Sequence, residues 1–401
     1  MSIEAEKQYF LRKDHASDIV NDSYIKFLRD KSIQFVAVRH DIIRSFQLAV
    51  NEGKISNEEL KKFLDKETRF GHNRTVMCKD LDIYSLKRLK SMTENEIVEL
   101  MKKKGWNRPK QNNILSIYLP ETLTLAEVSI IETEEINLTF IETIKTLKKN
   151  IIDRENNYYF ITVDLLQGTL YIRMRPRGNN VTLTDGDDYK KVTDTQCFYK
   201  ILKTCTDMLD ITLIDSTHFK STLYLIAKEL TEKAEEQWRN EVQKYNENIQ
   251  EFSQEIESKL NGLDKNSFDL EFRLHRLLER ALIQSNFEQI KQKEPGKKGF
   301  INAFHFSDKS GGKIKASSRE KERAIDLSEI YYDTRDTIDK RKAYDTVWVN
   351  WFVPGKKVSL STRLEANNEF YQVHFYNYLN EDDYYYVLSE INYFKQKQVN
   401  E

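Results

Sequence analysis

The feature that most constrains this sequence is an amphipathic run from Leu223 to Leu260. Apolar residues recur along it in steps of three and four, most positions between them are charged or amide residues, and neither Pro nor Gly interrupts it. This spacing predicts one helix on the order of 55 Å long, at about 1.5 Å per residue. The pair Asn261-Gly262 ends the pattern, and a second helical pattern follows over Ser267–Lys291. We therefore expect an antiparallel helical hairpin, with a parallel coiled-coil dimer through the first helix as the alternative.

The composition is that of a globular protein. The chain has 401 residues, of which 39% are hydrophobic and 32% are charged, and this length allows about two or three domains. These values exclude a membrane protein and a disordered chain. No apolar run approaches the length of a membrane-spanning helix, and the N-terminal residues lack the apolar core of a signal peptide. We therefore expect a cytoplasmic protein with no membrane association.

The charged and metal-binding residue types give little sign of a cofactor. The 63 Lys and Arg residues are balanced by 64 Asp and Glu residues, so a nucleic-acid site has to be a local patch. The cysteines Cys78, Cys197 and Cys205 form no C-x-x-C pair, and no two histidines are spaced as a helical metal pair. Phosphate-loop, dinucleotide-binding and nucleophile-elbow motifs are also absent. The sequence predicts no metal, no cofactor and no structural disulfide.

Changes of pattern along the chain predict an α+β fold in five segments. These are a helical N-terminal region (1–110), a mixed α/β domain in the middle (111–216), the long antiparallel helical hairpin (217–294), a linker rich in Gly, Lys and Ser (295–318), and a small β-meander plus helix at the C-terminus (319–401).

Local patterns predict individual elements within these segments. Two capping boxes, Ser56 with Glu59 and Thr93 with Glu96, mark helix N-termini in the first segment. The elements expected in the middle domain are strands over Asn113–Leu119 and Leu123–Ile131, a helix from Ile136 to Ile151, and a β-hairpin of Tyr158–Leu165 and Thr169–Pro176. The C-terminal meander is expected over Thr346–Val353, Lys357–Ala366 and Glu369–Leu379, before a helix that begins at Asn380.

The second strand of the predicted β-hairpin carries the first candidate site. Alternation along the strand places Tyr171, Arg173 and Arg175 on the face opposite Leu170, and Arg177 follows shortly after. A row of exposed arginines beside a tyrosine grips phosphates and stacks a base. We therefore interpret these four residues as a nucleic-acid contact, to DNA or RNA.

Two other loops have weaker signals of the same kind. His72 lies between Arg69 and Arg74 in a turn that suits a phosphate. A basic and aromatic cluster follows the helix capped by Thr93, and it consists of Lys102 to Lys104, Trp106, Arg108 and Lys110. Pairing of these cations with nearby carboxylates or helix carbonyls is the simpler interpretation of both loops.

A metal-dependent nuclease is the alternative function. Such an enzyme holds a divalent ion with acidic residues at strand ends, and a lysine steadies the attacking water. Asp164 on the predicted hairpin and the D-x-K pair of Asp188 and Lys190 have the required order. Asp-rich turns are common in so charged a chain, so this set of catalytic residues is kept as the second hypothesis.

The sequence as a whole favours a cytosolic interaction protein. The middle domain is expected to contact nucleic acid or phosphate, and the helical hairpin is expected to bind a protein partner or a second copy of the chain. A role in a mobile element or an anti-phage system is a further hypothesis, based on a composition that is common in AT-rich genomes.

Overall fold

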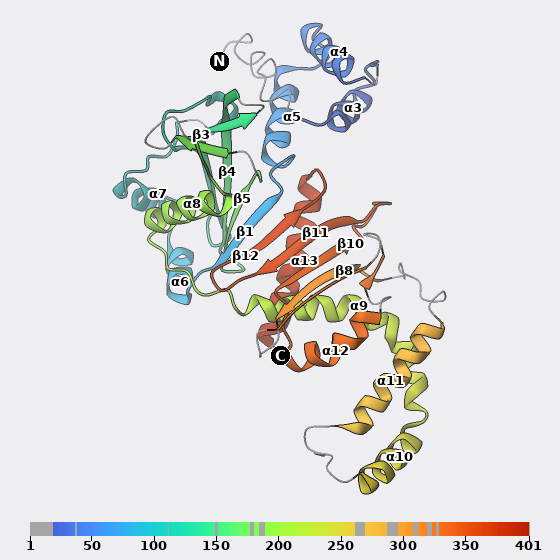
Figure 1. The fold of residues 1–401 in the computed structure, drawn as a ribbon. Coiled ribbons are helices and arrows are strands. Elements are labelled where there is room, and N and C mark those ends of the chain that lie inside the picture. The colour runs from blue at the N-terminus through green and yellow to red at the C-terminus, as the bar shows by residue number, and fades with distance from the viewer. Residues whose placement is uncertain are drawn as a thin grey trace. The chain divides into compact units, whose positions relative to one another are not determined.

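The computed structural model describes most of the chain (Figure 1). The described residues are 19–36, 38–110, 112–148, 151–176, 180–183, 189–260, 269–286, 296–307, 312–318, 323–325 and 329–400. The chain divides into two compact units, the first formed by Met1–Thr217 with Asn367–Leu388 and the second by His218–Ala366 with Ser389–Glu401. Residues 1–110 and 111–216, predicted as separate segments, thus share one unit, while the predicted segment 319–401 is divided between the two.

The first unit is built on an antiparallel sheet. Its strands lie in the order β7-β6-β3-β4-β5-β1-β12, and β2 pairs with β3 beside this path. The strands are β1 (Thr75–Asp80), β2 (Thr124–Ile131), β3 (Glu135–Lys148), β4 (Ile151–Asp164), β5 (Thr169–Met174), β6 (Asn180–Leu183), β7 (Tyr189–Lys191) and β12 (Tyr371–Phe375).

Helices cover both faces of this sheet. They are α3 (Asn21–Asp30), α4 (Arg39–Asn51), α5 (Asn57–Arg69), α6 (Ile83–Ser91), α7 (Glu94–Lys103) and α8 (Asp194–Leu209). Phe160 and Ile161 are neighbours on β4 and therefore point to opposite faces. Ile161 belongs to the core that contains the apolar side of α8, whereas Phe160 belongs to a second core formed with α3, α4 and α5. Figure 1 shows α8 lying across the strands β3 to β5.

The second unit combines a smaller antiparallel sheet with helices. Its strands lie in the order β11-β10-β8-β9, and α9 packs against β8, β10 and β11. The elements are α9 (Phe219–Gln243), α10 (Asn246–Lys259), α11 (Leu270–Ser285), β8 (Gly299–Ser307), β9 (Lys313–Ser317), α12 (Glu329–Arg341), β10 (Thr346–Trp351) and β11 (Leu360–Ala366). Helix α13 (Glu381–Asn400) contributes residues to both units.

The α+β class predicted from the sequence is confirmed, and so are the two capping boxes. The side chain of Ser56 accepts a hydrogen bond from the Glu59 amide at the start of α5, and Thr93 and Glu96 form the same reciprocal pair at the start of α7. Each box satisfies backbone groups that the first turn of a helix leaves without partners.

The helix predicted from Ile136 to Ile151 is wrong. These residues form β3 and the beginning of β4, which pair along their whole length from Glu135 with Asp164 to Lys148 with Ile151. Isoleucine and threonine are frequent here, and such β-branched residues favour strands. Ile136, Leu138 and Phe140, two positions apart, lie in the core on one face of the sheet, whereas Ile141 lies in the core on the other face, as the period of a strand requires.

The predicted linker 295–318 is also corrected. Its described residues form the β8–β9 hairpin, in which β8 pairs with β10 as well. Phe304 and Phe306 lie buried on one face of β8. Gly299 faces the neighbouring strand, where a Cβ atom would lie 2.4 Å from the Asn350 carbonyl oxygen. Glycine therefore permits close pairing at this position, and the residue that suggested a linker instead begins a strand.

Two further elements differ from their predictions. Residues predicted as the strand Asn113–Leu119 contain the short 3₁₀ helix Ile114–Ser116 instead. Strand β1 lies within the region predicted to be all helical, and it pairs with β5 and β12.

The amphipathic run from Leu223 to Leu260 is divided into two helices. Lys244 and Tyr245 separate α9 from α10, and their amides donate to the carbonyls of Glu241 and Val242, three residues back. A turn of this type interrupts the regular four-residue ladder without Pro or Gly. Helix α11 packs against both α9 and α10. The predicted stop at Asn261-Gly262 lies outside the described residues.

Candidate binding sites

The predicted arginine row lies on a covered face of the first unit. Alternation does place Tyr171 and Arg173 on the face opposite Leu170, but Tyr171 is only 3% exposed and Arg173 only 7%. Phe70 and Tyr384, both distant in sequence, lie over this face. The expected exposure of these two residues is therefore wrong. Arg175 is half-buried just beyond the end of β5, and Arg177 lies outside the described residues.

Arg173 is held in an aromatic cage. Its guanidinium carbon lies 4.2 Å from the ring centroid of Phe70, 4.4 Å from that of Tyr384 and 5.2 Å from that of Phe160. Among the described residues, no hydrogen-bond partner reaches its buried Nε and Nη1 atoms. Burial lowers the pKa of Arg173, since a charged group loses its hydration there. The aromatic faces offset part of that loss.

Arg74 lies beside this cage. Thr75 pairs with Met174 across β1 and β5, so residues 74 and 175 form the next cross-strand position. The Nη1 of Arg74 donates to the Tyr376 carbonyl at 3.0 Å, while its Nε is buried with no hydrogen-bond partner in the described part of the chain. Burial and the charge of Arg175 both lower the pKa of Arg74. From the sequence, Arg74 was only weakly indicated as a phosphate contact, because the pairing of β1 with β5 was not predicted.

The residues of the nuclease alternative do not converge. Asp164 pairs with Glu135 at the start of β3, and its carboxylate accepts a hydrogen bond from the Gln167 amide in the following turn. Lys190 lies on β7 next to the part of β6 that pairs with Lys145, near the other end of β3. Along β3, about nine residues lie between the position beside Asp164 and the position nearest Lys190, which is a distance of about 30 Å. Asp188 lies outside the described residues.

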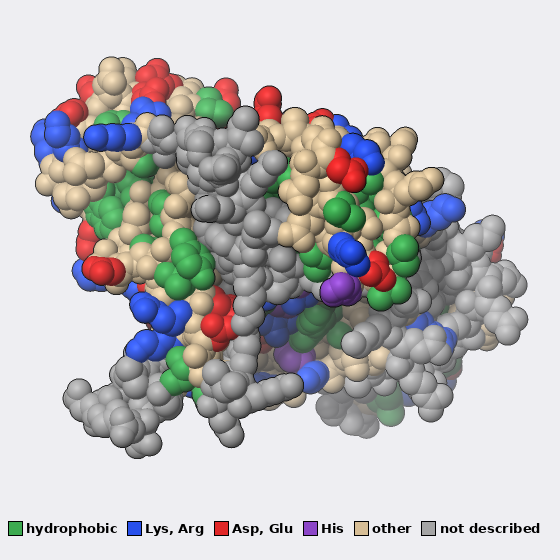
Figure 2. Space-filling model, turned by 90° about the horizontal axis from the view of Figure 1, so that it is seen from above, with side chains coloured by type: hydrophobic (Ala, Val, Ile, Leu, Met, Phe, Trp, Pro, Cys, Tyr) green, Lys and Arg blue, Asp and Glu red, His purple; other side chains and the backbone are tan. Residues whose placement is uncertain are grey.

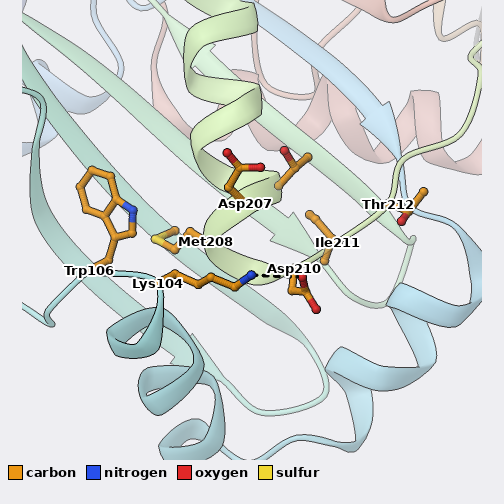
Figure 3. A pocket seen from close by; sticks show the side chains of 8 residues that line it. Lys104, Trp106, Asp207, Met208, Asp210, Ile211 and Thr212 are labelled. Atoms are coloured by element: carbon orange, nitrogen blue, oxygen red, sulfur yellow. Dashed lines mark hydrogen bonds and ion pairs between the residues drawn. The ribbon is translucent and has the colours of Figure 1, made fainter.

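Two residues of the second basic and aromatic cluster, Lys104 and Trp106, line a pocket of about 470 Å³ at the C-terminal end of α8 (Figure 3). Lys104 points across it to Asp210, with 3.3 Å between Nζ and the carboxylate, and Trp106 closes one side with its ring 5.1 Å from that of Phe140. Arg108 pairs with Glu94 at 2.6 Å. These contacts fit the simpler interpretation, in which the cations are engaged with carboxylates of the protein.

An apolar groove of about 570 Å³ lies between α9 and α11 in the second unit. Trp238, Val242 and Tyr245 line one side, and Leu278, Ala281, Leu282 and Ser285 line the other, with Glu241 at its border. Tyr245 is 60% exposed and Leu278 is 42% exposed. The sequence pattern placed Tyr245 in the apolar stripe of one continuous helix, because it did not show the break at Lys244 and Tyr245.

A polar pocket is also lined by residues of these helices. Arg276 donates to Glu279 at 2.9 Å and to Asp339 at 3.2 Å, and Arg239 lies 3.7 Å from Glu279. His275 contacts the Asn246 side chain at 2.7 Å. These residues line a second pocket of about 560 Å³. The basic side chains that line this polar pocket are thus engaged with acidic residues of the same unit.

The described residues show no strong feature of other site types. Among them, no group of three or more His, Cys, Asp and Glu side chains is placed to hold a metal ion. The three cysteines are buried free thiols, and burial raises the pKa of Cys205 to about 12. Figure 2 shows acidic and basic side chains interspersed over the described part of one face. No helix in the described ranges is long and apolar enough to cross a membrane.

Compared with models of protein families and with curated proteins, the sequence matches none of them. The candidate binding sites are therefore the groove of the second unit and the arginines of the first.

Proposed function

We propose that this chain is an interaction protein whose second unit binds a helix of a partner protein. The observation that carries the proposal is the apolar groove between α9 and α11. Its sides repeat at helical spacing, with Trp238, Val242 and Tyr245 on one wall and Leu278 and Ala281 on the other. Grooves of this type receive the apolar ridge of an amphipathic helix.

Charge defines the partner further. Glu241 borders the groove and pairs with Lys244, and the adjoining α10 carries four glutamates and one lysine, so the charge beside the groove is net acidic. Arg239 and Arg276 line the polar pocket instead and are paired with carboxylates there. An amphipathic helix with lysine or arginine beside its apolar ridge complements this arrangement, because opposite charges at the rim guide association.

The test uses a fluorescent model peptide, an amphipathic helix with leucines at helical spacing and lysines on its flanks. Leu278→Asp is expected to lower its affinity at least tenfold, about 1.4 kcal/mol. Leu277→Asp is the matched control, since Leu277 is the adjacent leucine, is 59% exposed and does not line the groove. Equal affinities of the two variants would contradict the proposal.

Self-association is the competing outcome. Sedimentation of the unmodified protein across a concentration series measures it directly. A dimer that Leu278→Asp dissociates and Leu277→Asp does not would assign the groove to a second copy, and the proposal of a foreign helix would fail.

A further inference from the structure

Three arginines gather at one end of β1 and β5 in the first unit. Val76 pairs with Arg173 and Thr75 with Met174, so Arg74 and Arg175 occupy the next cross-strand position. Because strand residues alternate between faces, all three arginines belong to the same face. Directly opposite residues are about 5 Å apart at Cβ, and diagonal ones about 7–8 Å.

Burying Arg74 and Arg173 without an anion is costly. Like charges at opposite positions of a sheet destabilise it, and burial strengthens their repulsion. Among the described residues, neither Arg74 nor Arg173 forms an ion pair, and three of their nitrogens are buried without a hydrogen-bond partner. Neighbouring arginines on the same unit do find carboxylates, as Arg69 does with Asp65 and Glu127.

We propose that Arg74 and Arg175 bind a phosphoryl group at this end of the sheet, with the positive charge of Arg173 beneath them. A guanidinium presents a planar fork of N–H donors that matches the oxygens of phosphate. A phosphoryl group offers more acceptor oxygens than a carboxylate, so it suits two forks better. Phe70 and Tyr384 stack on Arg173 without offering it an anionic oxygen, and the nearby Glu381 carboxylate offsets only part of its charge.

The proposal does not depend on the groove of the second unit, and it changes the predicted nucleic-acid contact. Tyr171 is buried and cannot stack a base without a rearrangement of the sheet. Tyr376 contacts Arg74 through its carbonyl, but its ring lies 5.1 Å from that of His374, which pairs with Thr75 and so belongs to the other face of the sheet. The site is therefore expected to contact phosphate without stacking a base.

The first experiment uses inorganic phosphate alone. Thermal unfolding of the full chain is followed in phosphate and in chloride of equal ionic strength, and phosphate is expected to raise the melting temperature further. Arg74→Gln and Arg175→Gln are each expected to weaken phosphate binding at least tenfold. Arg108→Gln removes the same charge from an arginine already paired with Glu94 and is expected to bind as the wild type does.

The outcomes are distinct. If Arg74→Gln does not fold, Arg175→Gln on the half-buried neighbour still decides the question, and Arg175→Lys is expected to bind with intermediate affinity because it keeps charge but loses the fork. Equal effects of phosphate and chloride, or unchanged phosphate binding in Arg175→Gln, would overturn the proposal.

A second measurement identifies the source of the phosphoryl group. A short single-stranded oligonucleotide that competes with phosphate would assign the site to nucleic acid. In Arg175→Gln, the slope of its log affinity against log salt concentration is then expected to fall by about one unit. Binding of phosphate without the oligonucleotide would support a site for a small phosphorylated molecule. An oligonucleotide that binds equally well to Arg175→Gln would count against this site as the contact.

Discussion

Replacing Arg173 by Met tests how a buried cation is tolerated in the first unit. Methionine has a comparable unbranched stem, so the substitution removes the charge while it keeps most of the contact with Phe70 and Tyr384. Replacing it by Ala removes both. The two variants together separate the contribution of charge from that of packing.

The magnitudes follow from the cage. Three cation–π contacts at 4.2, 4.4 and 5.2 Å are worth about 1 kcal/mol each, or about 3 kcal/mol in all. Against them, Nε and Nη1 are buried without hydrogen bonds, which costs about 1–3 kcal/mol for each group. The balance lies between about 1 kcal/mol in favour of the arginine and about 3 kcal/mol against it, so Arg173→Met is expected to change the free energy of unfolding by no more than about 3 kcal/mol. Arg173→Ala is expected to be a further 2–4 kcal/mol less stable, roughly the cost of a cavity.

Urea unfolding followed by circular dichroism and by tryptophan fluorescence measures both variants. The wild type and the variants are compared in a buffer free of phosphate, so that an anion does not contribute. A loss of more than about 4 kcal/mol in Arg173→Met would refute the reasoning, because it would show that the guanidinium has strong partners that the cage does not supply.

Two other perturbations give defined results. Thr93→Ala removes the N-terminal cap of α7, whose Ile97 and Met101 are buried in the core, and it is expected to cost about 1 kcal/mol by urea unfolding; no change would mean that Glu96 alone maintains the first turn. Although burial opposes its ionisation, hydrogen bonds from Lys220 and Ser307 lower the pKa of Asp345 below the ordinary value of 3.8. Its contribution to stability is therefore present above pH 3.8 and lost as the pH falls through the lowered pKa. Asp345→Asn should be less stable at neutral pH, and the difference from the wild type should shrink in acid; a constant difference would contradict this.

Local features were the ones that the sequence predicted correctly. The capping boxes at Ser56 and Thr93 depend on residues only three positions apart, so no tertiary information is needed to recognise them. The β-hairpin around Gln167-Gly168 is similar, because β4 and β5 are joined by a short turn. The alternation that placed Arg173 opposite Leu170 was also correct.

The burial of Arg173 could not be predicted, because the residues that cover it are distant in sequence. Tyr384, which covers Arg173, lies more than two hundred positions later on α13. Arg74 becomes the neighbour of Arg175 only when β1 pairs with β5. Pairing partners of a strand are set by the whole sheet, and a single sequence does not show them.

The prediction from hydrophobic periodicity was wrong where a helical spacing and a strand spacing were both present. The apolar residues from Ile136 to Ile151 satisfy a helical spacing, yet β-branched residues favour the strand that forms, with Ile136, Leu138 and Phe140 on one face and Ile141 on the other. The break at Lys244 and Tyr245 has no Pro or Gly to signal it. Tyr245 at this break lines the groove, so the candidate docking site could not be located from the sequence alone.

Hydrogen exchange of the full chain, with and without the lysine-flanked model helix, tests the docking account most directly. Binding in the groove is expected to slow amide exchange in the two walls, residues 238–245 and 278–285. Exchange at Arg276 in the polar pocket and in the sheet of the first unit is expected to stay unchanged. Leu278→Asp should abolish this protection, and Leu277→Asp should retain it. Protection that appears elsewhere, or none at peptide concentrations that saturate the anisotropy signal, would contradict the assignment of the groove as the partner site.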